Sequence, residues 1–208
     1  MPVEIPEDFA RKTADLAALV RQLEPRGWFP ATSSNFSARV AGGNGLVAVS
    51  VSGISKDRLE AKDFLLVDAK GDVVAAPYGG KPSAETLLHT MLYERPDVGV
   101  VLHSHSVAAT VVSMKRRSAG KVTFAGLEIL KAFAGITTHE TELEFPIFPN
   151  TQDIAALARS VGSYLKAHPA TRGYLIAGHG LYTWGKDIAE AKRHLEALEF
   201  LLAVELAS

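Results

Sequence analysis

The chain has 208 residues, of which 47% are hydrophobic and 22% charged, and its formal net charge is −1. These values are typical of a soluble globular protein with one sizeable core, so we expect a single domain covering residues 1–208. A net charge this close to zero provides no electrostatic footprint for nucleic acid or an anionic membrane, and we expect neither as a partner.

The sequence contains no cysteine. This excludes disulfides, thiolate nucleophiles and zinc–thiolate sites, so any metal must be held by nitrogen and oxygen ligands. The N-terminal stretch MPVEIPEDFARK has no apolar core followed by a cleavage site, and no apolar run reaches the roughly 18 residues of a membrane span. We therefore expect a cytoplasmic protein.

The first half of the chain indicates an amphipathic helix followed by two hairpins and a second helix. Apolar side chains recur at helical spacing up to Pro25, glycine-rich or polar turns separate the strands, and Pro82 opens the second helix. We predict helices over 7–24 and 83–94, strands over 36–40, 46–52, 64–67 and 73–75, a hairpin turn at 41–45 and a helical or turn-like connection at 54–59. His89, inside the second helix, is interpreted as structural.

The second half alternates strands and helices. We predict strands over 98–102, 121–124, 145–148, 173–177 and 181–184, and helices over 107–114, 126–132, 151–166 and 187–205. Asp153 and Asp187 stand where they can cap the last two helices. This order of elements favours an α/β fold, a three-layer α/β/α domain with a largely antiparallel central sheet.

The apolar strand that begins at Val98 ends in His103, Ser104 and His105. On an extended chain, residues two apart project from the same face, so both imidazoles are expected to converge. His179, in LIAGHG, terminates another apolar run between two glycines. Three histidines at strand ends favour a site for a divalent transition metal over ordinary structural histidines, which remain the alternative.

Three polar turns offer backbone N–H groups together with a hydroxyl or amide side chain, the donors that cradle a phosphate. They are Thr32 to Asn35, Ser52-Gly53 and Pro82-Ser83. Each could equally be an ordinary turn or helix cap. Their occurrence beside the histidines makes an anion site a reasonable hypothesis, with Asn35, Ser52, Gly53 and Ser83 as its candidate residues.

Two carboxylates stand out. Glu85 falls in the predicted first turn of its helix, where compensation of the helix dipole would explain it and would keep its pKa low. Glu128 lies in the mostly apolar GLEILKAFAG, where partial desolvation would raise its pKa toward neutrality, as suits a general acid or base. We therefore rank Glu128 as the principal acid/base residue and Glu85 as secondary.

The motifs SSNFS, SVSGI, KPSAE, LHSHS and AGHGLYTWG, in this order, resemble the class II aldolase and adducin-head family. The resemblance covers nearly the whole chain. It implies an α/β/α fold, one zinc ion per subunit bound by His103, His105 and His179, and a homotetramer with its sites near subunit boundaries. The apolar C-terminal residues Leu195, Leu198, Leu201, Leu202 and Val204, which could need a partner, agree with an oligomer.

Residues 127–153 resemble the branch of this family that dehydrates 5-methylthioribulose 1-phosphate in methionine salvage. That resemblance implies a small phosphorylated sugar as substrate, with Glu128 at the position of the branch's acid/base glutamate. In the aldolase branch the glutamate of the PSxE motif moves the proton, and Glu85 occupies that position. A sugar-phosphate aldolase and a non-catalytic adducin-like scaffold therefore stay open as alternatives.

Overall fold

The computed structural model describes residues 4–41 and 45–208, so most of the predicted turn at 41–45 lies outside the described residues. Within them the chain builds one nine-stranded sheet in the order β4-β3-β2-β1-β5-β9-β8-β7-β6. The strands are β1 Phe36–Arg39, β2 Val47–Ser50, β3 Phe64–Val67, β4 Val73–Ala75, β5 Val100–Ser104, β6 Lys121–Ala125, β7 Glu142–Phe148, β8 Gly173–Ile176 and β9 Gly180–Gly185.

The sheet is antiparallel at every pairing except that of β7 with β8. β5 lies in the middle, with four strands on each side, and its residues His103 and Ser104 pair with Tyr182 and Leu181 of β9. The predicted α/β class with a largely antiparallel sheet is therefore confirmed.

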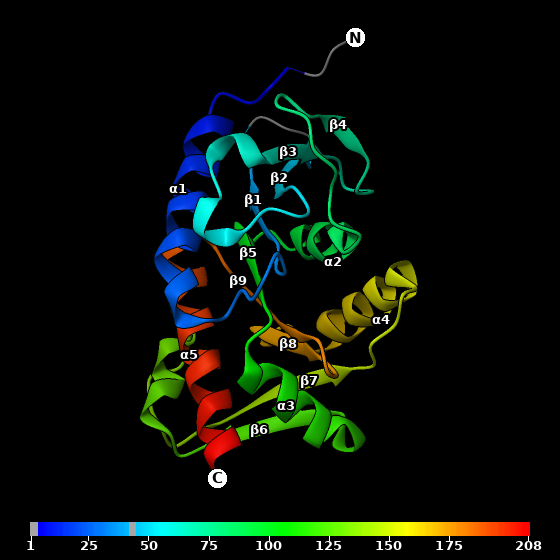
Figure 1. Cartoon of the computed structure of the whole chain (residues 1–208). Helices are drawn as coiled ribbons and strands as arrows, with labels where there is room; N and C mark the ends of the chain where they lie inside the picture. The colour runs from blue at the N-terminus through cyan, green and yellow to red at the C-terminus, as the bar shows by residue number, and fades with distance from the viewer. Residues whose placement is uncertain (1–3, 42–44) are drawn as a thin grey trace.

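Helices cover both faces of the sheet (Figure 1). Residues of α1 (Phe9–Leu23), α3 (Val107–Arg116) and α5 (Ile188–Ala207) contribute to one apolar cluster. Residues of α2 (Thr86–Thr90) and α4 (Ile154–Ala167) contribute to a second cluster, built on alternate strand residues such as Val49 and Val101. The two clusters are the two interfaces of a three-layer α/β/α arrangement.

The capping residues define where three of the helices begin. Asp153 accepts a hydrogen bond from the backbone N–H of Ala156, and Asp187 accepts one from that of Glu190, so both predicted caps are present. Ser106 does the same for Ala109 and starts α3 directly after the histidine strand. These side chains satisfy donors that a helix N-terminus leaves unpaired.

Three predicted elements differ from the structure. The helix expected over 83–94 is α2 followed by a 3₁₀ segment, Met91–Glu94, because Pro82 forms an isolated antiparallel bridge with Val51 at the end of β2 and holds 81–85 as a turn. The helix expected over 126–132 is the 3₁₀ segment Glu128–Ala132. β7 begins at Glu142, since its polar first residues pair with β6.

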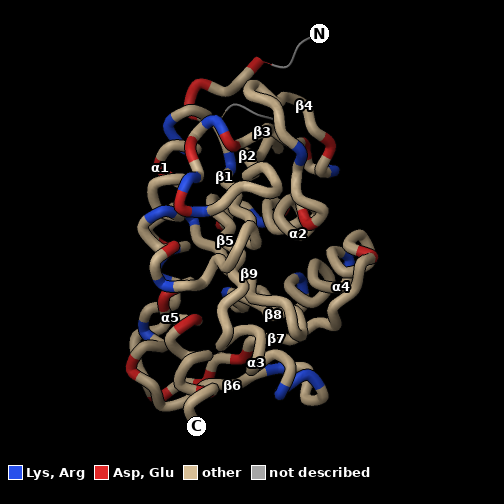
Figure 2. Tube along the Cα trace, in the orientation of Figure 1, with Lys and Arg blue, Asp and Glu red and all other residues tan. Residues whose placement is uncertain are grey.

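Most of the apolar residues singled out in α5 turn inward. Leu195, Leu198, Leu201 and Leu202 are fully buried in the chain's own core, whereas Val204 is half-buried and Phe200 is exposed. The four leucines therefore need no second subunit to cover them, and the homotetramer stays a prediction. Basic and acidic residues are interspersed along α1 and α5 (Figure 2), and no helix among the described residues is long and apolar enough to cross a bilayer.

Candidate metal centre

His103 is held in one orientation by the central strand that carries it. Its side chain is fully buried and its ring stacks on Tyr182 of β9, with centroids 4.0 Å apart. Nδ1 donates to the backbone carbonyl of Leu181 over 2.8 Å, which leaves the lone pair on Nε2. That Nε2 is buried and has no hydrogen-bond partner among the described residues, which fits an atom that ligates a metal ion.

The other two predicted histidines converge on His103. The ring centroids of His105 and His179 lie 4.4 and 5.2 Å from that of His103, and 4.7 Å from one another. His179 sits in the turn between β8 and β9. A Cβ at Gly180 would come within 2.0 Å of the Ser104 carbonyl oxygen, so only glycine allows this turn to approach β5.

Glu85 joins the three histidines from the turn before α2. Its Oε1 lies 2.8 Å from His179 Nε2, and its Oε2 lies 3.5 Å from His103 Nε2. One ligand atom from each of the four residues falls within 4.8 Å of all the others. The structure thus assembles a three-nitrogen, one-carboxylate set in which a metal ion can be held.

The electrostatics of the site favour neutral His103 and His105 and an ionised Glu85. Burial lowers the pKa of His103 well below its ordinary value and that of His105 to about 4. Burial alone would raise the pKa of Glu85, but hydrogen bonds from His179 and Asn35 and electrostatic interactions with the adjoining histidines hold it well below its usual range. Deprotonated ligands are the form that a metal binds, so the residues present fit a divalent ion.

Asn35 fixes Glu85 from the end of β1. Its Nδ2 donates to Glu85 Oε2 over 2.6 Å and to Ser83 Oγ over 3.1 Å, while its Oδ1 contacts Nε2 of the buried His89. His89 in turn bonds Ser37 Oγ through Nδ1. Both donors of the Asn35 side chain are therefore used within the protein, and His89 is structural in the sense that it supports this network.

The remaining phosphate candidates lie at one rim of the site. Ser52 and Gly53 are exposed, and Gly53 adopts φ +83°, the left-handed conformation that suits glycine. The backbone N–H of Ser52 donates to Lys81 O, which brings this turn against the 81–85 turn that carries Ser83. Ser83 has no support from a helix dipole, because α2 has only five residues. The assignment of these residues to a phosphate stays a prediction.

Glu128 does not lie where the desolvation argument put it. Its side chain is 69% exposed, it pairs with Lys131, and its carboxylate is 3.5 Å from His139 Nδ1. The hydrogen bond from Lys131 lowers its pKa, so the expected rise toward neutrality is wrong for the single chain. Leu127, Ile129 and Leu130 pack toward the core of the protein, and the side chain of Glu128 points to solvent. Glu85, which the sequence ranks second, is the carboxylate that contacts the histidines.

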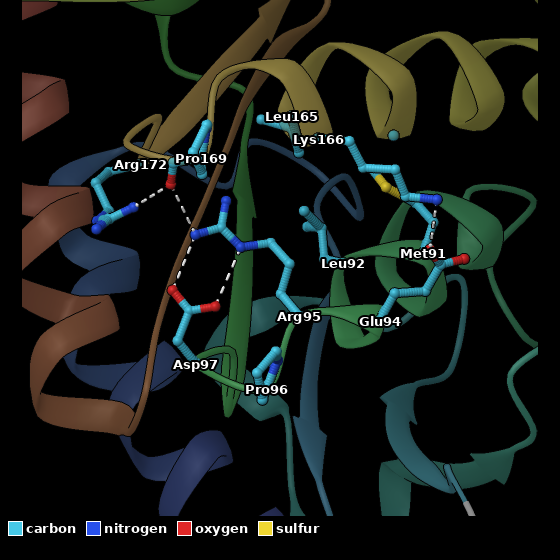
Figure 3. A pocket seen from close by; sticks show the side chains of 11 residues that line it. Met91, Leu92, Glu94, Arg95, Pro96, Asp97, Leu165, Lys166, Pro169 and Arg172 are labelled. Atoms are coloured by element: carbon cyan, nitrogen blue, oxygen red, sulfur yellow. Dashed lines mark hydrogen bonds and ion pairs between the residues drawn. The ribbon is translucent and has the colours of Figure 1, made fainter.

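A charged pair outside this site, Arg95 with Asp97, has a structural explanation. A cavity of about 440 Å³ lies where the end of α2 faces α4, and Figure 3 shows Arg95 at its edge. Arg95 forms a two-bond pair with Asp97, donates to Pro169 O and lies over the Trp184 ring. These contacts fasten the entry to β5, and none of the predicted site residues lines this cavity.

The fold and the sequence are both similar to those of known proteins. Residues 14–206 match the model of the class II aldolase and adducin N-terminal domain. The methylthioribulose-1-phosphate dehydratase of Hahella chejuensis is 54% identical over 86% of this chain and 85% of its own. That of Methylococcus capsulatus is 50% identical over 95% of this chain and 94% of its own.

Among solved structures, an aldolase II superfamily protein from Pseudomonas syringae superimposes with a TM-score of 0.77 at 23% identity, covering 98% of this chain and 77% of its own. At that identity the likeness concerns the fold.

Proposed function

This chain belongs to the class II aldolase and adducin N-terminal domain family, and we propose that within it the chain is a zinc-dependent dehydratase of methionine salvage. The substrate would be 5-methylthioribulose 1-phosphate, and the products water and 2,3-diketo-5-methylthiopentyl 1-phosphate. Support comes from the relatives at about 50% identity that carry the dehydratase name. The structural observation that carries the proposal is the convergence of His103, His105 and His179, which can bind the metal ion that the reaction needs.

His103, His105 and His179 would hold the metal, and Glu85 borders it. A zinc ion bound there would act as a Lewis acid and lower the pKa of the substrate's C3 proton. Three imidazoles also suit iron, cobalt or nickel, so zinc is part of the proposal. One zinc ion per subunit is part of the proposal, and the four-residue cluster in the described part of the chain supports it.

We infer that Glu85 accepts the C3 proton. Its carboxylate is ionised and 14% exposed, and Asn35 fixes its orientation, so it can meet a substrate without rearranging. Loss of the C4 hydroxyl then needs a proton donor. The enol that results carries the oxygen at C3 and becomes the second ketone when C4 is protonated.

We propose Glu128 as that donor, acting on the site of a neighbouring copy in a homotetramer. The exposed position of Glu128 in the single chain supports this, because an exposed carboxylate is available to an adjoining subunit. Burial at such an interface would raise the pKa of its carboxyl toward neutrality, the condition that an acid needs. Its position in the dehydratase-like segment supports the same role.

The test is a product assay with 5-methylthioribulose 1-phosphate, run with the metal-loaded protein, after chelation, and after zinc is restored. We expect diketone formation that chelation abolishes and zinc restores. Absence of turnover by protein of full metal content would refute the dehydratase assignment.

A sugar-phosphate aldolase is the second candidate, and the contact of Glu85 with the histidines favours it, since the aldolase branch uses that glutamate. An aldolase would break the C3–C4 bond and release an aldehyde, which a coupled dehydrogenase assay detects with the same substrate. An adducin-like scaffold is disfavoured because it has no use for the four-residue cluster. Elemental analysis of the purified protein that found no bound metal would revive it.

A further inference from the structure

A buried lysine lies beside the site and has no part in the metal cluster. Lys56, in the 3₁₀ segment Lys56–Arg58, is only 1% exposed. Its Nζ donates to Ile54 O over 2.7 Å and to Thr32 O over 3.2 Å, so it joins two of the three polar turns that the sequence singles out. Thr32 belongs to the turn that ends in Asn35, and Asn35 donates to Glu85, so this turn links Lys56 to the metal centre.

The charge of Lys56 is uncompensated. No carboxylate pairs with it among the residues that the structure describes, and two carbonyl oxygens satisfy only two of its three N–H donors. Burial lowers the pKa of Lys56 to about 8, so the cation still predominates at neutral pH. Burying an unpaired ammonium is costly, and an anion that binds beside it would offset that cost.

A second unpartnered group lies in the same turn. Ser34 is 7% exposed, and its Oγ is buried without a hydrogen-bond partner among the described residues. Its backbone has φ +72°, a conformation that a non-glycine residue adopts at a cost. Strain together with an unused buried hydroxyl is typical of a position kept for a ligand.

We propose that Lys56 and Ser34 form the inner wall of the anion site, where Lys56 supplies the positive charge that binds the phosphate group of the substrate. This deepens the proposed function and rests on it for the identity of the phosphorylated sugar. The exposed turn Ser52-Gly53 would form the outer wall. A dianionic phosphate bound there would face a cation and a hydroxyl donor, two groups that phosphate sites use.

Inorganic phosphate provides a test that needs no turnover. Calorimetric titration of the metal-loaded protein should show binding that Lys56→Met weakens by roughly 10- to 100-fold, the usual worth of a hydrogen bond to a charged group. Ser34→Ala should weaken it less. Lys12→Met is the control, because Lys12 Nζ also bonds a backbone carbonyl, that of Arg39, but lies at the opposite end of β1 and already pairs with Asp8. The control should leave phosphate affinity unchanged.

The kinetic test uses 5-methylthioribulose with and without its phosphate. Lys56→Met should raise KM for the phosphorylated sugar by the same factor as the phosphate dissociation constant, with little change in kcat, and should leave kcat/KM for the unphosphorylated sugar as in the parent. If the parent turns over neither sugar, the proposed function fails while the phosphate titration still decides the role of Lys56.

A merely structural lysine would behave differently. Lys56→Met would then lower the melting temperature and leave phosphate affinity as in the parent, and that result would overturn the proposal. Should Lys56→Met and Lys56→Gln both fail to fold, side-chain NMR of the parent decides, since phosphate must shift the Nζ signal of a buried lysine. A signal that stays unmoved at saturating phosphate counts against the site.

Discussion

At the scale of single residues, the strongest dependence is that of the metal on its three imidazoles. His103→Ala, His105→Ala and His179→Ala should each lose bound metal and nearly all activity, because each removes one of the convergent nitrogen donors. Elemental analysis after dialysis measures this. His139→Ala is the control, an exposed histidine outside the cluster, and it should keep full metal content. A metal content of one ion per chain in all three variants would show that these histidines do not bind the metal.

The histidines could be found from sequence because their geometry is local. Residues two apart, such as His103 and His105, share one face of any extended strand. The glycines on either side of His179 predict a tight turn. The contact of Glu85 with the histidines could not be predicted, because the turn that carries Glu85 follows a bridge between Val51 and Pro82 that no local pattern encodes. The exposure of the Glu128 side chain could not be predicted either, because apolar neighbours in sequence do not determine which side of a 3₁₀ segment faces solvent.

At the scale of elements, one contact fastens α5 to the strand that carries the histidines. Glu199 is 2% exposed, and its Oε1 accepts a hydrogen bond from Ser104 Oγ over 2.5 Å. Burial raises the pKa of its carboxyl to about 7 despite hydrogen bonds from Ser104 and Ser106. The folded chain therefore carries a proton there at pH values where the unfolded chain has lost it.

That proton makes stability pH-dependent in a defined direction. Between the ordinary glutamate pKa and about 7, the unfolded state binds fewer protons than the folded state, so the free energy of unfolding falls as pH rises, and it levels off above. Glu199→Gln cannot ionise and should lack this fall, which amounts to about 2–3 kcal/mol between about pH 5 and about pH 8. Urea denaturation at both pH values measures it.

Glu196→Gln, at a more exposed position of the same helix, should keep the pH dependence of the parent. Equal pH dependence in the parent and Glu199→Gln would mean that Glu199 is already ionised in the folded chain.

Most elements could be predicted because their signals are local. Apolar periodicity and Pro25 place α1, and aspartate caps place the starts of α4 and α5. The order of the strands in the sheet depends instead on which strands pair with one another. The parallel pairing of β7 with β8, and the central place of β5, arise from contacts between distant segments, for which the sequence alone has no periodic signal.

At the scale of the whole molecule, metal should stabilise the fold, because the three histidines come from two separate segments: β5 with the residue after it, and the β8–β9 turn. A ligand at 100 times its dissociation constant adds about 2.7 kcal/mol. For a chain of this size that raises the melting temperature by roughly 5–10 °C. Calorimetry of chelated and zinc-loaded protein measures it, and the His103→Ala protein, loaded in the same way, should show no such rise.

The proposed tetramer makes a prediction about mixed assemblies. Glu85→Gln and Glu128→Gln should each lose about 10²–10⁴-fold in kcat while retaining zinc. If Glu128 serves a neighbouring site, tetramers co-assembled from equal amounts of the two variants regain about a quarter of the parent sites, because a symmetric interface combines intact residues from different copies. Light scattering must show the tetramer in each sample.

Assemblies that stay as inactive as either variant alone would place both carboxylates on one chain's own site. A monomeric mass at micromolar protein concentration would refute the tetramer itself.

Because β5 is the central strand, the proposed metal-binding and phosphate-binding residues lie in different parts of the sheet. The imidazole of His103 stands on the strand furthest from either edge of the sheet, while Thr32, Ser52 and Gly53 lie on exposed turns at the sheet's end. Turns at a surface accept substitution more readily than a fully paired interior strand. A library of variants in which only those turns are randomised should therefore yield proteins that accept new substrates. Every variant in it would keep the same metal-binding residues.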